Sequence, residues 1–302
     1  PAIEAGWSIN KTVHDKPTDY NGWSPLNADR QWHGDMPLYQ ALANSYNIPA
    51  INTFKSIGIK TGIEKGKQFG LNLTSKNDNL TTALGAGVGT NPWQMAQAYA
   101  TFANDGIMND AHLIKKIVNA SGQTIATAKV KSKRVIDSNT AQKMTSMMLG
   151  TYTNGTGIYA APYGYTLAGK TGTNEDIDQW VIGYTPDVVM TLWLGYENPQ
   201  SDLHRLDDTS AGTASAVFRT MSSSILPYTD NTQFKEKNAY SLDGVEATAV
   251  PSNDPAVNDV VEEAKNKTKA ITDKTKDFSD KASKRVKEVG GSVWDRVKSL
   301  FD

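Results

Sequence analysis

Three short stretches of this 302-residue chain have the pattern of β-strands, and the connections between them are short. The stretches are residues 166–171, 179–184 and 188–196, and the last two are joined by Thr185-Pro186-Asp187. Connections of this length can join antiparallel strands, whereas parallel strands need a crossover of about a dozen residues or more. The chain is therefore predicted to fold around an antiparallel sheet.

Segments with the apolar spacing of helices lie before and after these strands. The predicted helices cover 36–57 with a break near Pro49, 92–103, 137–149 and 211–225, and a small hairpin is predicted over 113–118 and 123–130. Pro92 suits the first turn of a helix, and Asp137 or Ser138 can cap the helix over 137–149. Residues 1–35 are rich in Asn, Asp, Pro and Gly and are predicted to be irregular. Helices around an antiparallel sheet predict an α+β domain over residues 1–228.

The remaining residues, 229–302, have a different composition and are predicted to form a polar linker and a charged tail. Residues 251–302 contain eleven Lys or Arg and ten Asp or Glu with few aromatic residues. Such a segment buries too little apolar surface to hold a fold, so the tail is predicted to be largely disordered. An apolar stripe over 284–301 predicts an amphipathic helix at a membrane surface or on a partner, and a solvated tail is the alternative.

The overall composition excludes several kinds of protein. The 31 basic and 32 acidic residues nearly cancel, which argues against a nucleic-acid partner. The chain has no cysteine, so disulfides and thiolate chemistry are excluded. The four histidines show no metal-ligand spacing, and we expect neither a metal nor an organic cofactor. The sequence contains no apolar run of about 18 residues, the length needed to span a membrane.

Two polar motifs far apart in the sequence carry the candidate chemistry. Lys170-Thr171-Gly172-Thr173 lies among the predicted strands, and Ser45 and Asn47 lie in the first helical region. The first motif offers a positive charge and two hydroxyls on an extended edge, and Gly172 lets another chain approach the backbone. These groups suit an extended peptide that ends in a carboxylate. Ser45 and Asn47 add a hydroxyl and an amide, so the two motifs are predicted to line one groove.

Acyl transfer through a serine is the chemistry that these groups suit. Ser45 is predicted to relay a proton near the leaving group, because no lysine follows it three residues later. Asn47 is predicted to hydrogen-bond the substrate backbone, and Lys170 to keep its charge and ease the ionisation of its neighbours. Thr171 and Thr173 are predicted to bind the terminal carboxylate, with the N–H of Thr173 forming half of an oxyanion hole.

A nucleotide-binding loop is the alternative for the same region. The run from Gly164 to Thr171 satisfies the phosphate-loop pattern G-x-x-x-x-G-K-T. That loop works only between a strand and a helix, because the helix N-terminus faces the phosphates. The residues after Gly172 lead into another predicted strand, so the context disfavours this alternative.

Several motifs, in the same order along the chain, resemble the transpeptidase domain of class A penicillin-binding proteins. They are the run from Ala41 to Ala50 with Ser45-Tyr46-Asn47, Gly85-Ala86-Gly87 with the segment to Gly106, Gly155-Thr156-Gly157, Ala168 to Thr173, Asp178-Gln179-Trp180 and Trp193 to Tyr196. The resemblance covers residues 1–228. It implies an antiparallel five-stranded sheet covered by helices, as in penicillin-binding proteins and serine β-lactamases.

The resemblance also implies an activity and a setting. A member of this family would be a D-alanyl-D-alanine transpeptidase that cross-links peptidoglycan stem peptides from lipid-linked precursors and is acylated by β-lactams. It would act at the extracytoplasmic face of the bacterial membrane. In the chain it would follow an amino-terminal membrane anchor and a glycosyltransferase domain. These are expectations of the resemblance.

One family motif is not found in its expected place. The family nucleophile lies in a Ser-x-x-Lys motif just before a stretch that resembles Pro1-Ala2-Ile3-Glu4-Ala5-Gly6, so the nucleophilic serine and the basic lysine are expected outside this chain. The run from Ser8 to Lys11 has the same spacing, but it lies after that stretch and lacks a helical pattern. The chain is therefore expected to be an inactive fragment, and a non-catalytic module that binds cell-wall peptide is the alternative.

Overall fold

The computed structural model describes residues 1–174, 177–196, 206 and 209–242. The chain divides into two compact units, 1–250 and 251–302. The second unit, with the helix expected over 284–301, lies outside the described residues. Within the described part of the chain, no helix is both long enough and apolar enough to span a membrane.

The sheet consists of strands β7 (Ala168–Asn174), β8 (Asp178–Tyr184) and β9 (Val189–Gly195), in the order β7-β8-β9. Both pairs are antiparallel, so the predicted sheet type is confirmed. The sheet has three strands in the described residues, and the five-stranded sheet stays a prediction. Among these residues β7 pairs only with β8, so its second edge has no strand partner in the described part of the chain.

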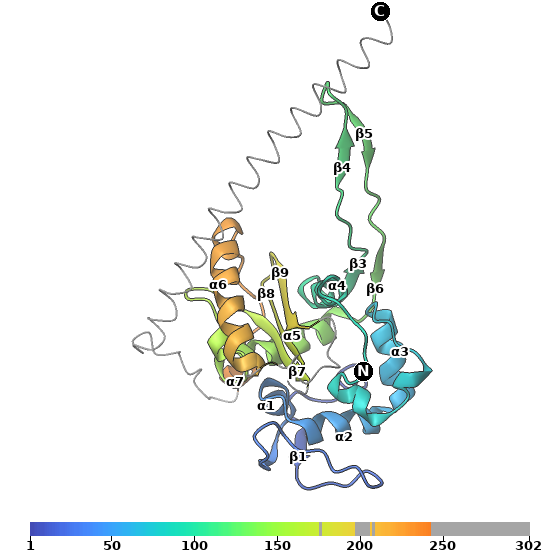
Figure 1. Ribbon diagram of the computed structural model, residues 1–302, viewed down its shortest axis with the longest axis vertical. Helices are drawn as coiled ribbons and strands as arrows, with labels where there is room; N and C mark the ends of the chain where they lie inside the picture. The colour runs from blue at the N-terminus through green and yellow to red at the C-terminus, as the bar shows by residue number, and fades with distance from the viewer. Residues whose placement is uncertain (175–176, 197–205, 207–208, 243–302) are drawn as a thin grey trace, which may run out of the picture. The chain divides into compact units, whose positions relative to one another are not determined.

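Helices α5 (Ser138–Thr153), α6 (Ser215–Ile225), α4 (Pro92–Ala103) and α1 (Leu38–Ala43) pack around this sheet (Figure 1). Asp137 caps α5 through a hydrogen bond from the Thr140 N–H, as its sequence position predicts. Phe218 of α6 and Val181 of β8 are fully buried in one cluster, and Tyr184 lies in another with residues of α5. These clusters fix β7 against α5, and α1 packs on α5 in turn.

The amino-terminal part contains more regular structure than its sequence predicts. Strands β1 (Thr12–Asp15) and β2 (Gly34–Pro37) form an antiparallel ladder, mostly within the segment predicted to be irregular. Residues 36 and 37, predicted to begin a helix, instead end β2. Helix α2 (Asn47–Ile57) is followed by α3 (Ile59–Gln68), which the sequence pattern did not indicate. Such short elements are stabilised by tertiary contacts, which composition and periodicity do not reveal.

The predicted helix break near Pro49 is wrong by several residues. Helix α1 ends at Ala43, and α2 begins at Asn47, so Pro49 lies in the first turn of α2. Proline is tolerated there because the first N–H groups of a helix have no partner within the helix. The break instead surrounds Ser45, whose φ of 59° is left-handed.

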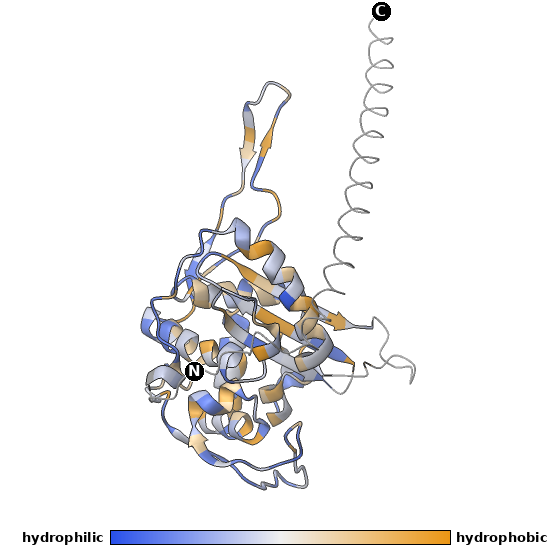
Figure 2. Ribbon diagram, turned by 90° about the vertical axis from the view of Figure 1, so that its left-hand side faces the viewer, coloured by the Kyte–Doolittle hydropathy of each residue, from blue (hydrophilic) through white to orange (hydrophobic). Residues whose placement is uncertain are grey.

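The predicted hairpin is present and projects away from the rest of the unit (Figures 1 and 2). Strands β4 (Lys116–Val118) and β5 (Thr124–Thr127) form its outer part, and β3 (Ile107–Asn109) pairs with β6 (Ser132–Arg134) at its base. Five short elements complete the described chain: η1 (Ser75–Asn77), η2 (Leu80–Leu84), η3 (Ile158–Ala160), η4 (Ser210–Ala214) and η5 (Leu226–Tyr228). The last helix, α7 (Ala239–Leu242), contributes the buried Tyr240.

Candidate active site

Lys170 of β7 and Ser45 meet although 125 residues separate them. The Lys170 Nζ donates hydrogen bonds of 2.8 Å to the Ser45 Oγ and of 2.8 Å to the Thr171 carbonyl oxygen. Lys170 lies in β7, which pairs with β8 along its whole length, while Ser45 lies in the turn between α1 and α2. The structure therefore brings the two sequence motifs together at one edge of the sheet.

The ammonium of Lys170 lies in a partly desolvated place. Its side chain is partly buried, and none of the salt bridges among the described residues includes it. Burial disfavours the charged form and lowers the pKa of Lys170 to about 8. Near neutral pH the amine can therefore hold its proton and donate to Ser45, yet it gives up this proton more readily than a surface lysine does.

The lowered pKa of Lys170 predicts a rise in stability at alkaline pH. Below pH 8 the lysine is charged in the folded and unfolded chains, and folding carries the full cost of burying that charge. As pH rises from 8 towards the unfolded value of about 10.4, the folded chain loses its proton first, and the free energy of unfolding should increase. Urea unfolding between pH 7 and pH 10 measures this. Lys170→Met should lack that increase, and an equal increase in both proteins would contradict the assignment.

Ser45 occupies a position that usually belongs to glycine. Its N–H bonds the Leu42 carbonyl and the Tyr46 N–H bonds the Ala41 carbonyl, which is the Schellman arrangement at the end of α1. In that arrangement the residue with left-handed φ is most often glycine, because a side chain there is disfavoured. Ser45 therefore holds a backbone conformation that is unfavourable for a residue with a side chain.

Asn47 is the first residue of α2 and lies beside the loop of residues 26 and 27. Its Nδ2 donates to the Leu26 carbonyl at 2.6 Å, and its backbone N–H donates to the Asn27 Oδ1 at 2.8 Å. The bond to Leu26 uses one of the two N–H donors of the Asn47 amide, which leaves its second N–H and its Oδ1 to bind a ligand. No hydrogen bond among the described residues joins Asn47 to Ser45 or Lys170.

Thr171 points to the interior and links β7 to the end of α1. Its side chain is 6% exposed, and its hydroxyl lies 2.5 Å from that of Thr156. The N–H of Thr156 bonds the Ala43 carbonyl at 3.1 Å, so Thr156 connects β7 to the turn that contains Ser45. Sequence reasoning noted Thr156 only within a family motif and did not assign it this bridging position.

The hydroxyl of Thr173 is paired with a residue that sequence reasoning did not single out. Thr173 Oγ1 donates to Ser210 Oγ at 2.9 Å and accepts from the Ser210 N–H at 3.0 Å. Ser210 begins η4 and is 4% exposed. No motif marks this serine, because only the folding of the segment before α6 against β7 gives it a place at the site.

The glycines of β7 differ in what they tolerate, which gives a matched pair of variants. A Cβ on Gly169, whose φ is +157°, would lie 1.9 Å from the Ile182 carbonyl oxygen, whereas a Cβ on Gly172 would meet only the Trp180 Cβ at 3.6 Å. We expect Gly169→Ala to lower the free energy of unfolding by at least about 3 kcal/mol and Gly172→Ala by less than about 1 kcal/mol. Urea titration of both variants measures this, and equal losses would contradict the described register.

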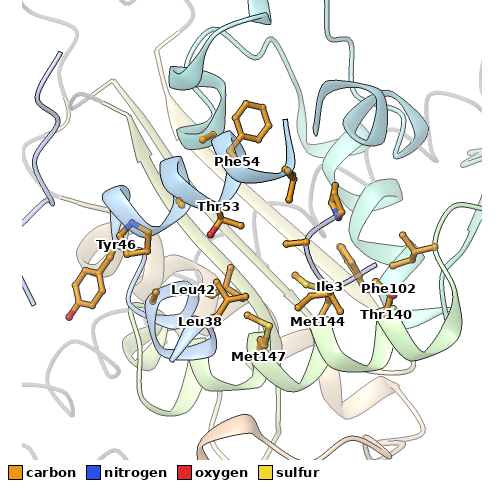
Figure 3. Close-up of a pocket in the computed structure, with 18 of the residues that line it drawn as sticks. Ile3, Leu38, Leu42, Tyr46, Thr53, Phe54, Phe102, Thr140, Met144 and Met147 are labelled. Carbon is orange, nitrogen blue, oxygen red and sulfur yellow. The ribbon is translucent and has the colours of Figure 1, made fainter. Parts of the chain in front are cut away.

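An apolar cavity of about 270 Å³ lies next to the Ser45 turn, between α1, α2 and α5. Leu38, Leu42, Phe54, Met144 and Met147 line it, and Tyr46 lies at one side (Figure 3). The residues from Pro1 to Ile3 form another part of its wall. A cavity with this lining suits an apolar element of a protein better than a polar ligand.

Neither the Ser-x-x-Lys run from Ser8 to Lys11 nor the phosphate-loop pattern ending at Thr171 lies at the start of a helix, where its chemistry would need it. Ser8 and Lys11 lie in a turn in which the Lys11 N–H bonds the Ser8 carbonyl, and no helix contains them. Lys170 lies within a strand, and the element after β7 is the strand β8, whereas a phosphate loop opens a helix. Among the described residues, no group of three or more His, Cys, Asp or Glu could hold a metal ion.

Comparison with known protein families gives one extensive match. Residues 1–222 match the family described as penicillin binding protein transpeptidase domain. Penicillin-binding protein 2a of Streptococcus pneumoniae is 43% identical over the whole chain, and penicillin-binding protein 1A of Neisseria meningitidis serogroup A is 34% identical over 66% of it. The chain spans 42% and 27% of the lengths of these two relatives.

Solved structures share the fold at lower sequence identity. Penicillin-binding protein 1A from Haemophilus influenzae has a TM-score of 0.67 and 24% identity, with 78% of this chain and 41% of that chain covered. PonA1 from Mycobacterium tuberculosis, in complex with penicillin V, has a TM-score of 0.68 and 23% identity, with 83% and 72% covered. The transpeptidase fold expected from the sequence is therefore confirmed.

Proposed function

The chain belongs to the penicillin-binding protein transpeptidase family, and from this we propose that it forms the substrate-holding part of a peptidoglycan D,D-transpeptidase site. The observation that carries the proposal is the 2.8 Å hydrogen bond from Lys170 to Ser45 at the open edge of β7. It supports one groove that is lined by a cation, hydroxyls and an unpaired strand edge. An extended stem peptide with a terminal carboxylate suits such a groove.

The reaction would proceed by two acyl transfers. In the first, the nucleophilic serine oxygen forms a bond to the penultimate D-Ala carbonyl carbon, the peptide C–N bond breaks, and the terminal D-Ala leaves after its nitrogen gains a proton. In the second, the amine of a neighbouring stem peptide forms a bond to the ester carbonyl carbon, the ester C–O bond breaks, and the proton that the amine loses passes to the leaving serine oxygen. A serine ester of this kind splits one difficult transfer into two easier ones.

Lys170 and Ser45 would supply the proton that the leaving nitrogen gains. Lys170 donates to Ser45 and so leaves the Ser45 hydroxyl hydrogen free to point towards the substrate. Because its pKa is lowered to about 8, Lys170 can replace the proton that Ser45 passes on. The positive charge would also stabilise the anion that develops on the substrate carbonyl.

The other predicted site residues would bind the substrate. The open edge of β7 would pair with the peptide backbone, and Gly172 leaves space for it. Thr173 is proposed to bind the terminal carboxylate by exchanging its hydrogen bond with Ser210 for one to the substrate. Thr171, whose hydroxyl contacts that of Thr156, would form the base of the carboxylate-binding site. Asn47 would offer its Oδ1 to a substrate N–H.

The nucleophilic serine and its lysine base are proposed to lie in a segment before Pro1. The apolar cavity beside the Ser45 turn supports this, because Pro1 and Ile3 line it and an apolar helix that ends at Pro1 could fill it. Such a helix would deliver a serine from its Ser-x-x-Lys motif near Ser45. The chain by itself would then bind peptide without being acylated.

The longer protein would work at the extracytoplasmic face of a bacterial membrane. An upstream anchor would hold it there, and an upstream glycosyltransferase domain would polymerise lipid-linked precursors whose stem peptides this site joins. β-Lactams would acylate the same serine, because they resemble the D-Ala-D-Ala end of the stem peptide. Serine acyl transfer needs no metal or organic cofactor. The charged tail could add a contact with the membrane.

The decisive experiment compares two forms of the protein with fluorescent penicillin. The form extended upstream through the Ser-x-x-Lys motif should gain a covalent label that survives denaturation. The 302-residue chain should stay unlabelled at the same concentration. Labelling of Ser8 in the chain itself, identified by mass spectrometry, would show that the nucleophile is not upstream.

Further measurements test the two alternatives, a non-catalytic peptide-binding module and a nucleotide-binding loop. An extended form that takes no label but still binds a D-Ala-D-Ala peptide would be a non-catalytic module. Addition of ATP with Mg²⁺ should leave the melting temperature unchanged, since Lys170 is not followed by a helix. A shift with nucleotide and none with penicillin would favour the phosphate loop.

A further inference from the structure

A buried hydrogen-bond network lies directly behind the Ser45–Asn47 turn. Asp15, the last residue of β1, is 0% exposed, and its Oδ2 accepts hydrogen bonds from Asn27 Nδ2 at 2.7 Å and from the His33 N–H at 3.0 Å. His33 Nδ1 lies 2.9 Å from the same oxygen. Three donors therefore converge on one carboxylate oxygen. None of these residues belongs to the motifs that the sequence singles out.

The network reaches the turn by two routes. Asn27 accepts a hydrogen bond from the Asn47 backbone N–H through its Oδ1, while its Nδ2 is held by Asp15. The His33 ring stacks on Tyr46, with the ring centroids 4.1 Å apart and an angle of 17° between the planes. Tyr46 and Asn47 follow Ser45 directly in the chain. The position of the Ser45 hydroxyl is thus connected to Asp15 through two neighbouring residues.

Stability alone does not explain Asp15. Its second oxygen, Oδ1, is buried and has no hydrogen-bond partner among the described residues. A buried carboxylate oxygen that accepts nothing is unfavourable, so a carboxylate here must do something that an apolar side chain could not. Its one evident effect is to orient Asn27 and His33 against the turn.

We propose that Asp15 and His33 are positioning residues, which hold the Ser45–Asn47 turn in the geometry that acylation needs. The inference rests on the proposed function of Ser45 and Asn47 and deepens it. Asp15 is too far inside to touch substrate and acts only through Asn27 and His33. A displacement of about 1 Å in such a turn can slow catalysis by about 100-fold, even when substrate still binds.

The same ladder provides a matched control pair. His14 of β1 and Asp35 of β2 also form a histidine–carboxylate contact, at 2.9 Å, and both side chains are at least half exposed. Asp35 contacts both His14 and Lys16, and none of these residues belongs to the turn. Variants of His14 and Asp35 therefore remove the same kind of interaction from β1 and β2 without reaching Ser45.

The first test measures hydrogen exchange in residues 44–48 of the 302-residue chain. Asp15→Ala should speed exchange of the Asn47 amide at least about tenfold, because Asn27 loses its buried carboxylate partner and is held through Nδ2 only by the Gln31 carbonyl. Asp15→Asn should keep most of the protection, since its amide oxygen can take the place of Oδ2 while its NH₂ takes the unpaired position. Asp35→Ala and His14→Phe should match the parent. Parental protection in Asp15→Ala would overturn the proposal.

The second test uses the extended form and separates binding from chemistry. In stopped-flow reactions with fluorescent penicillin, Asp15→Ala should lower the acylation rate constant at least about tenfold and change the dissociation constant of the non-covalent complex less than about threefold. His33→Phe keeps an aromatic ring against Tyr46 but loses the contacts of the ring nitrogens with Asp15 and with Asp29, at 2.9 Å and 3.1 Å. Its acylation rate constant should lie between those of the parent and Asp15→Ala. A fall in binding alone, or no fall in either constant, would overturn the proposal.

The two tests distinguish failure of the inference from failure of the proposed function. If the extended parent takes no label, the proposed function fails, while the exchange test still decides whether Asp15 positions the turn. If Asp15→Ala does not fold, Asp15→Asn and His33→Phe are judged by the same exchange and rate criteria. Parental behaviour of His33→Phe in both tests would then overturn the proposal.

Discussion

Lys170→Met in the extended form should slow acylation by fluorescent penicillin at least about 100-fold, while the melting temperature at pH 7 rises. The rate should fall because the variant loses the cation that donates to Ser45 at 2.8 Å and stabilises the developing anion. The stability should rise because a partly buried charge without a salt-bridge partner is replaced by an apolar side chain of similar length. Loss of activity with a gain in stability is typical of a functional residue.

The control for this variant is Lys67→Met. Lys67 is an exposed lysine of α3 whose ammonium pairs with Glu64 at 2.8 Å. Removing it should leave the acylation rate constant unchanged and alter the free energy of unfolding by less than about 0.5 kcal/mol. Near-parental acylation by Lys170→Met would count decisively against the proposed role of Lys170.

Ser45→Gly is the second variant with a large expected effect on acylation. It removes the hydroxyl and at the same time relieves the left-handed backbone, since glycine tolerates a φ of 59°. We expect the acylation rate constant to fall about 100-fold, which is the contribution of a positioned proton donor. The free energy of unfolding should stay within about 1 kcal/mol of the parent, because the relieved strain offsets the lost hydrogen bond to Lys170.

Two further variants separate the hydroxyl from the backbone. Ser45→Ala also lacks the hydroxyl but keeps a Cβ at the left-handed position. If the hydroxyl carries the effect, the glycine and alanine variants should be acylated equally slowly. Asn231→Gly relieves a φ of 51° elsewhere in the chain and should react like the parent. A glycine variant that reacts as fast as the parent would show that Ser45 has no chemical role.

The features that the sequence predicted well depend on local signals. The helix over 92–103 begins and ends as predicted, because Pro92 and the Asn91 cap start it and Asn104-Asp105-Gly106 stops it. The predicted start of α5 follows from its Asp137 cap, although the helix runs four residues further, to Thr153. The antiparallel sheet follows from short connections. In each case, the feature follows from interactions between residues that are close in the sequence.

The features that the sequence missed depend on distant contacts. Helix α3 is amphipathic but contains Gly62 and Gly66, which lower helix propensity, and β1 and β2 have only four residues each. Contacts with the rest of the unit stabilise such short or weak elements. The helix break was placed at Pro49 because proline usually ends helices, yet the end of α1 is set by the left-handed Ser45. A left-handed serine is not recognisable from its sequence neighbours.

The candidate site shows the same division. The sequence identified Lys170, Ser45 and Asn47 as chemically suited groups, but their roles stay predictions. It assigned no bridging position to Thr156 and did not single out Ser210, because isolated hydroxyl residues carry no signal until folding places them beside Thr171 and Thr173. It also did not show that one N–H of the Asn47 amide is bound by the Leu26 carbonyl.

By itself, the amino-acid order determined the antiparallel sheet, the main helices and the chemical character of two motifs, since each follows from interactions between near neighbours. Only the tertiary structure decided that the ammonium of Lys170 reaches the hydroxyl of Ser45 and loses enough water to lower its pKa to about 8. It also decided that Asp15 and His33 support the adjoining turn. The desolvation of Lys170 and its contact with Ser45 depend on how segments far apart in the chain pack together. No local sequence pattern specifies that packing.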